Sequence, residues 1–202
     1  FDYFNDDFND FSPGWSWIGR RQDISDIEWS LWIPFSRLLV PWIIAHLVVS
    51  RILKSIRCSS TIICCWYISI TILFLWQYAG GVATVFLFTQ PSIACLLTSF
   101  KNKRIAYVVH FLTLAVIQLT PVLEVILQDW MSLNEEVYQM IIVAICWMQL
   151  RSISCSIDNI NDYEHKDIMG FFKNFIQSTA YCLYLPTLFL GPFVLYSEFV
   201  KG

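Results

Sequence analysis

The sequence predicts an all-α protein, a polytopic bundle of transmembrane helices whose final element is broken or re-entrant. Of the 202 residues, 56% are hydrophobic and 14% charged, whereas soluble domains carry about 25% charged residues to cover their surface. Apolar residues form charge-poor runs of about 20 residues, which is the length a helix needs to cross the bilayer core. Basic residues gather in alternate connections between these runs. A soluble enzyme, a disordered linker and a secreted disulfide-stabilised module are therefore excluded.

The first predicted span covers about 31–50, where Arg37 is the only charged residue. The longest run, Cys58 to Phe100, has no Lys, Arg, Asp or Glu, and it is about twice as long as one span requires. Because Ala79-Gly80-Gly81 is a turn signal near its middle, we expect two helices, at about 60–78 and 82–100. Pro91 is expected to kink the second of them.

Two further spans and an interrupted element follow. The uncharged run Ile105 to Leu123 predicts a span at 105–123, and Val137 to Ile157 predicts one at 137–157. The last run, Phe175 to Ser197, contains Pro186 and the pair Gly191-Pro192. Because an unbroken helix there would lose backbone hydrogen bonds in lipid, we expect a broken or re-entrant element at 175–197.

The charge of the connections predicts the orientation of the chain. Bases follow the first span, at 51–57, and the third, at 101–104, whereas the connection 124–136 carries acids and no base. Since cytoplasmic connections collect Lys and Arg, the two basic connections are predicted to be cytosolic. We therefore divide the chain into a lumenal amino-terminal segment, 1–28, and a partial transmembrane domain, 29–202. Because the chain begins with Phe1 and shows no signal peptide, we expect it to be an internal fragment.

Arg151 is the most informative charged residue within a predicted span, because a charge at the centre of a transmembrane helix costs about 2.5–3.5 kcal/mol. Asp158 lies two turns further along nearly the same face, with Ser152, Ser154 and Ser156 between them. Arg151 is either an interfacial residue that extends toward cytosolic headgroups, or part of a polar seam that lines a buried cavity. In the first case Asp158 simply begins the next connection.

Other polar residues predict no separate chemistry. His46 and His110 have no acidic or histidine partner at helical spacing, so helix packing is expected for both. His165 belongs to a charged stretch that is typical of a solvated loop. The seven cysteines lie in or beside apolar runs and encode neither a disulfide framework nor a metal site. The net charge of −3 and the dispersed bases argue against nucleic-acid binding.

Several strings, in order, resemble the amino-terminal half of the Hedgehog acyltransferases, a branch of the membrane-bound O-acyltransferase (MBOAT) family. The likeness covers about residues 24–202. In addition, the stretch 151–158, Arg151-x-x-Ser154-x-Ser156-x-Asp158, resembles one that recurs more widely in the MBOAT family. The matching strings are Asp26-Ile27-Glu28-Trp29-Ser30-Leu31-Trp32, Ala45-His46-Leu47-Val48-Val49-Ser50, Tyr184-Leu185-Pro186-Thr187-Leu188, Gly191-Pro192 and Ser197-Glu198-Phe199-Val200-Lys201.

The resemblance implies an MBOAT-like fold and a multi-pass enzyme of the endoplasmic reticulum membrane. Such an enzyme moves palmitate from palmitoyl-CoA, its acyl-donor substrate, to the amino-terminal cysteine of a Hedgehog-type secreted protein; no cofactor or metal is implied. The family's catalytic histidine and its aspartate are expected beyond residue 202, so no catalytic residue is assigned here. The residues expected to line the cavity are Arg151, Asp158, Gly191 and Pro192.

Three alternatives remain open. A catalytically inactive MBOAT relative would act as a regulatory membrane protein, and it would lack the downstream histidine. A transporter would also contain broken helices and buried charges, and it would move a substrate without transferring an acyl group. A second acyltransferase branch esterifies serine on a secreted ligand, but the first-span strings and the region of Glu198-Phe199 favour the branch that forms a cysteine amide.

Overall fold

A computed structural model of the chain describes residues 11–13, 16–17, 19–23, 27–119, 124–161 and 168–201. These residues form helices and their connections, apart from one short hairpin in which β1 (Phe11–Pro13) pairs antiparallel with β2 (Arg21–Asp23). The chain divides into two compact units, Phe1–Trp42 and Ile43–Gly202. The hairpin belongs to the first unit and was not expected from the sequence, because three-residue strands leave too short a pattern to be recognised.

Three of the described helices are long and apolar enough to cross a membrane. They are α1 (Ile27–Ser55), α2 (Ser60–Ser99) and α5 (Glu135–Asn161). The candidate span within α1 begins at Glu28, and those in α2 and α5 take up the whole helix. The chain is therefore an all-helical membrane protein in its main architecture, as the charge-poor runs predicted.

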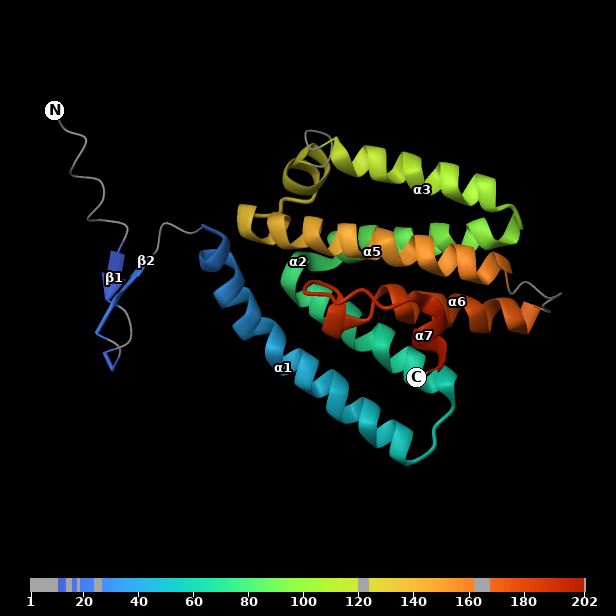
Figure 1. Cartoon of the computed structure of the whole chain (residues 1–202), viewed down its shortest axis with the longest axis horizontal. Helices are drawn as coiled ribbons and strands as arrows, with labels where there is room; N and C mark the ends of the chain where they lie inside the picture. The colour runs from blue at the N-terminus through green and yellow to red at the C-terminus, as the bar shows by residue number, and fades with distance from the viewer. Residues whose placement is uncertain are drawn as a thin grey trace. The chain divides into compact units, whose positions relative to one another are not determined.

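Gly80 divides α2 into two halves. Its φ of 83° and ψ of 169° lie outside the helical region, and this positive φ is accessible to glycine because it has no Cβ. Each half is about 20 residues long and so has the length of one span, about 30 Å. The second half runs back toward the side from which the first half came (Figure 1). Pro91 lies inside the second half without leaving helical φ and ψ.

The next two elements are α3 (Lys103–Gln118) and a π-helix, η1 (Val125–Trp130). The side chain of Asn102 accepts a hydrogen bond from the backbone N–H of Arg104 at 2.9 Å, which caps the start of α3. The helix ends before the predicted limit of 123, and residues 120–123 lie outside the described part of the chain. Whether α3 crosses the membrane stays a prediction.

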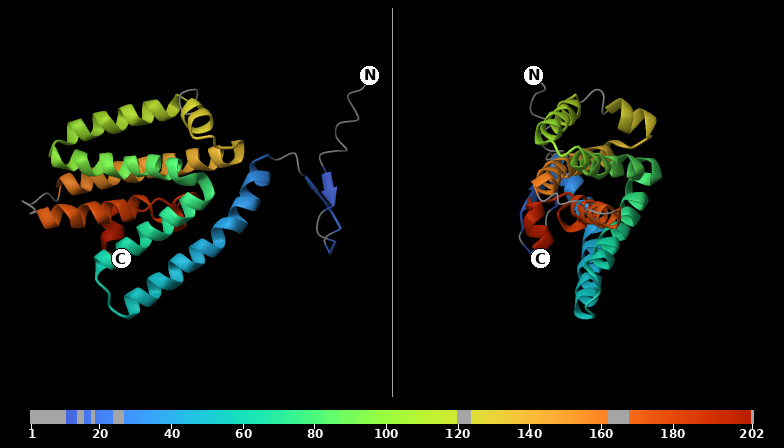
Figure 2. Two further views of the ribbon diagram at one scale, coloured as in Figure 1. Left: turned by 180° about the vertical axis from the view of Figure 1, so that it is seen from behind. Right: turned by 90° about the vertical axis from the view of Figure 1, so that its right-hand side faces the viewer.

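The final segment is interrupted. α6 (Ile168–Cys182) is followed by one turn of 3-10 helix, η2 (Leu185–Thr187), then by irregular chain and by the short α7 (Tyr196–Lys201). In the second unit α5 packs against α2, α3 and α6, as Figure 2 shows from two further sides. Small, fully buried residues allow these helices to approach closely; they are Ala94, Ala106, Ala144 and Ala180.

Candidate functional site

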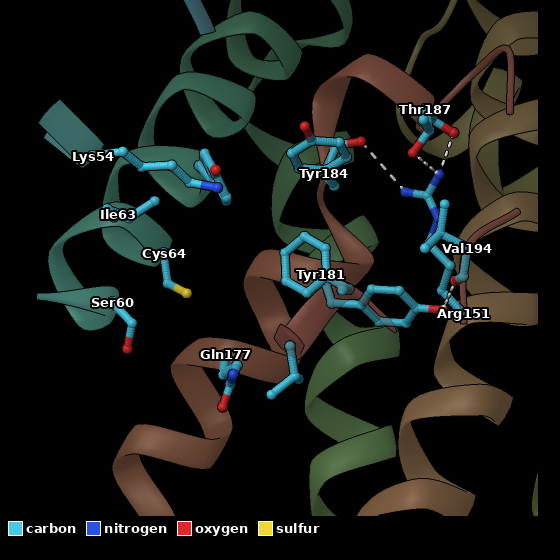
Figure 3. A pocket seen from close by; sticks show the side chains of 13 residues that line it. Lys54, Ser60, Ile63, Cys64, Arg151, Gln177, Tyr181, Tyr184, Thr187 and Val194 are labelled. Carbon is cyan, nitrogen blue, oxygen red and sulfur yellow. Dashed lines mark hydrogen bonds between the residues drawn. The ribbon is translucent and has the colours of Figure 1, made fainter. Parts of the chain in front are cut away.

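Arg151 of α5 holds the chain that follows α6. Its side chain is only 2% exposed, and Nη1 donates to the carbonyl oxygens of Cys182 at 3.2 Å and of Tyr184 at 3.4 Å. Nη2 donates to Thr187, both to its carbonyl oxygen and, at 2.6 Å, to Oγ1. Figure 3 shows the guanidinium group beside Thr187, the last residue of η2.

These hydrogen bonds explain how a charged residue is accommodated inside the bundle. Carbonyl groups at a helix end have no partner within the helix, and in a membrane each unsatisfied group is costly. The guanidinium group offers several donors in a planar arrangement and forms charge-assisted hydrogen bonds with them. The structure thus places Arg151 against protein carbonyls and away from the lipid-exposed surface.

Asp158 and Ser154 hold the start of α7. The carboxylate Oδ2 of Asp158 accepts a hydrogen bond from the backbone N–H of Ser197 at 3.2 Å, and Oγ of Ser154 accepts one from that of Tyr196 at 3.1 Å. The first N–H groups of a helix lack partners within it, so both side chains act as caps that belong to another helix. Arg151 and Asp158 thus bind the same segment from one face of α5.

Gly191 lies close to α5 at a third point. It is buried with a φ of 67°, and a Cβ added there would meet the Trp147 ring at 3.1 Å. Both the backbone conformation and the space therefore favour glycine. Pro192, which follows it, is exposed. The sequence had suggested that this pair shapes a cavity wall, and the structure places Gly191 in contact with α5.

A cavity of 390 Å³ lies beside the interrupted segment (Figure 3). It is lined by Lys54, Ser60, Ile63, Cys64, Tyr67, Arg151, Gln177, Tyr181, Tyr184, Thr187, Val194, Phe199 and Val200. Of the four residues that the sequence predicted to line a cavity, Arg151 belongs to this lining. Asp158, Gly191 and Pro192 lie outside it: Asp158 caps the segment that forms one wall, and Gly191 and Pro192 belong to that segment.

The cavity has an aromatic wall made by four rings. Phe199 lies 5.3 Å from Tyr181, 5.6 Å from Tyr184 and 6.3 Å from Tyr67, measured between ring centroids. Tyr67 and Tyr184 also meet edge to face at 5.2 Å. These residues come from α2, α6, the chain after α6, and α7, and none of them was predicted from the sequence to belong to a site. Tyr184 and Phe199 nevertheless lie in strings that carried the resemblance.

Polar groups line other parts of the cavity. Lys54 is in the last turn of α1 and Ser60 is the first residue of α2. Lys54 belongs to the basic connection that is predicted to be cytosolic, and Ser60 follows it closely. The cavity therefore combines an aromatic, apolar wall with cationic groups, which suits a ligand that has an apolar part and an anionic part.

The two described histidines lie in different surroundings. His46 is fully buried, stacks on Tyr67 at 4.6 Å and has no hydrogen-bond partner on either ring nitrogen. His110 is 3% exposed; its Nε2 lies 2.9 Å from Oγ of Ser156, and its Nδ1 lies 3.2 Å from Nε2 of Gln149. Both histidines therefore pack between helices, as expected, whereas His165 lies outside the described residues.

Among the described residues, no group of three or more His, Cys, Asp or Glu side chains is placed to hold a metal ion. A scan of the chain against models of known protein families finds no match.

Proposed function

We propose that the chain is part of an MBOAT-like acyltransferase of the endoplasmic reticulum membrane. In this proposal the whole enzyme moves palmitate from palmitoyl-CoA to the amino-terminal cysteine of a Hedgehog-type secreted protein. One observation carries the proposal: strings of sequence that resemble this family and lie far apart in the chain meet at one cavity. Arg151, Tyr184, Thr187 and Phe199 all belong to such strings and all line it.

The chemistry of the cavity lining supports an acyl-CoA as the ligand. An acyl-CoA joins a long aliphatic chain to a group that carries several phosphates. Lys54 supplies a positive charge beside the predicted cytosolic connection, where CoA is available, and phosphate binds readily to such a group. Tyr67, Tyr184 and Phe199 supply apolar surface to the aliphatic part.

We further propose that the segment 168–201 enters the membrane and returns to the same side. Its contacts first run back along α5 and then forward again. Thr187 binds Arg151, and Gly191 lies about one turn earlier on α5, against Trp147. Tyr196 then binds Ser154 and Ser197 binds Asp158, nearer the end of α5 that connects to α6. This order supports a re-entrant hairpin whose backbone is satisfied by protein groups, as lipid requires.

The proposed reaction forms an amide and releases CoA. The amino nitrogen of the acceptor attacks the thioester carbonyl carbon, the carbon–sulfur bond breaks with its electron pair leaving on sulfur, and the proton lost by the nitrogen is taken up by the released CoA thiol. Arg151 and Asp158 serve as positioning residues, because each acts through the segment that it holds. The catalytic histidine implied by the resemblance has no counterpart assigned among residues 1–202.

The test uses the full-length protein in lipid nanodiscs, with palmitoyl-CoA and a peptide that begins with cysteine. We expect a palmitoylated peptide whose linkage resists hydroxylamine, because it is an amide, and no such product from the same peptide with an acetylated amino terminus. Binding of palmitoyl-CoA without transfer would overturn the proposal in favour of an inactive relative. Substrate flux across liposomes without transfer would favour a transporter.

A further inference from the structure

Phe199 occupies the centre of the aromatic wall. Its ring packs against two separate buried clusters, one that contains Cys64 and Tyr67 and one that contains Tyr181 and Cys182. It also lines the cavity directly. A ligand that enters between these clusters therefore meets the Phe199 ring.

Phe199 belongs to α7, the shortest of the α-helices described in the second unit. α7 has six residues, whereas Tyr67 and Tyr181 stand on helices of 40 and 15 residues. The backbone hydrogen bonds that tie α7 to α5 are at its first two residues, Tyr196 and Ser197. Three of the four rings are thus fixed on or beside longer elements, and Phe199 is the one supplied by a short element.

We propose that Phe199 determines which aliphatic chain length the cavity accepts. This inference rests on the proposed function, because it takes the ligand to be an acyl thioester. The ring occupies apolar space at the cavity that the additional methylene groups of a longer acyl chain would need. A smaller residue at position 199 should therefore admit longer chains, and a larger one should exclude the chain that fits the wild-type protein.

The first measurement is the acyl preference of the full-length protein in nanodiscs. We compare Phe199→Ala and Phe199→Trp with wild type, using myristoyl-, palmitoyl-, stearoyl- and arachidoyl-CoA. In Phe199→Ala the ratio of kcat/KM for stearoyl-CoA over palmitoyl-CoA should rise about tenfold, because two more methylene groups become buried. Phe199→Trp should shift the preference toward myristoyl-CoA. Phe193→Ala is the matched control, since Phe193 is exposed and lies outside the cavity lining.

The second measurement reports binding without transfer. Cys64 lines the cavity and is 8% exposed, so a bound acyl chain should slow its reaction with N-ethylmaleimide. Cys58, which lies between α1 and α2 and outside the cavity lining, gives the reference rate in site-resolved mass spectrometry. In wild type palmitoyl-CoA should protect Cys64 best, and in Phe199→Ala the best protection should move to a longer chain. Phe199→Leu should lie between the two, and it replaces the alanine variant if that variant does not fold.

The outcomes separate the two proposals. Acyl transfer with the same chain-length profile in wild type and the Phe199 variants overturns the inference and leaves the proposed function intact. Absence of transfer from every thioester overturns the proposed function, and the protection of Cys64 then decides the role of Phe199. If no thioester protects Cys64, or if the best protecting chain is the same in every variant, the inference is wrong.

Discussion

Arg151 shows how a single buried charge organises a segment that lies more than 30 residues away. It donates to three backbone carbonyl oxygens and one hydroxyl oxygen. These acceptors have no hydrogen-bond partner within a regular helix, and without them the arginine would be an unpaired charge in the bundle. The carbonyl groups and the guanidinium group therefore satisfy each other's hydrogen-bonding requirements.

We predict that Arg151→Lys destabilises the protein nearly as much as Arg151→Gln, by about 3 kcal/mol. Lysine keeps the charge but lacks the planar set of donors, so several carbonyl groups lose their partners. Thermal unfolding in a fixed lipid nanodisc measures the loss, and labelling of the buried Cys182 by maleimide reports whether the segment has detached. A lysine variant as stable as wild type, with Cys182 still protected, would show that charge alone is needed.

His46 and His110 differ in their hydrogen bonds, so replacing each of them should change the stability differently. His46→Phe should leave the unfolding free energy within about 1 kcal/mol of wild type or increase it, because both ring nitrogens of the histidine lack partners. His110→Phe should cost about 1–3 kcal/mol, since Gln149 and Ser156 lose a hydrogen-bond partner. Chemical denaturation of both variants in the same detergent tests this. A larger loss for His46→Phe than for His110→Phe would contradict it.

At the scale of elements, the two halves of α2 depend on one glycine. We predict that Gly80→Ala destabilises the protein by about 1–2 kcal/mol, because a positive φ is unfavourable for a residue with a Cβ. A Cβ at this position would meet no other atom within 4 Å, so the loss of stability would come from the backbone conformation and not from a steric clash. Gly80→Asn should lose as much stability as Gly80→Ala, since asparagine tolerates positive φ mainly in the left-handed helical region, and the ψ of 169° places Gly80 outside it. Equal stability of the glycine and alanine proteins in thermal unfolding would refute this explanation of the bend.

The short helix α7 depends on caps from α5. Asp158→Ala should cost about 1 kcal/mol of stability through the lost hydrogen bond to Ser197. It should also lower acyl transfer by the full-length enzyme, because Phe199 is on the same helix. Asp158→Asn is the matched variant, since an amide oxygen can still accept this bond. If Asp158→Ala left folding, palmitoyl-CoA binding and transfer unchanged, the positioning role of this residue would be abandoned.

The sequence predicted those elements that depend on local pattern. Charge-poor runs predicted the long helices, Ala79-Gly80-Gly81 predicted the division of α2, and Pro186 with Gly191 predicted an interruption after α6. Contacts between distant residues were not predictable in this way. That Arg151 meets Thr187, or that Phe199 meets Tyr67, depends on how helices pack, and helical periodicity shows only that residues share a face.

At the scale of the whole molecule, the fold follows from the lack of water around most of the chain. Within a bilayer each backbone group must be satisfied by protein, so helices form wherever the chain is apolar. Where Pro186 and Gly191 prevent a continuous α-helix, Arg151, Ser154 and Asp158 of α5 supply the missing partners. The cavity lies beside this segment.

Membrane topology is the most direct test of this account. Single-site labelling of the full-length protein in sealed microsomes should find positions 54, 101 and 201 reactive from the cytosolic side. Position 134, in the acidic connection, should react only from the lumenal side. Reaction of positions 54 and 101 from opposite sides would contradict the arrangement of the spans, and lumenal reaction at 201 would contradict the re-entrant segment.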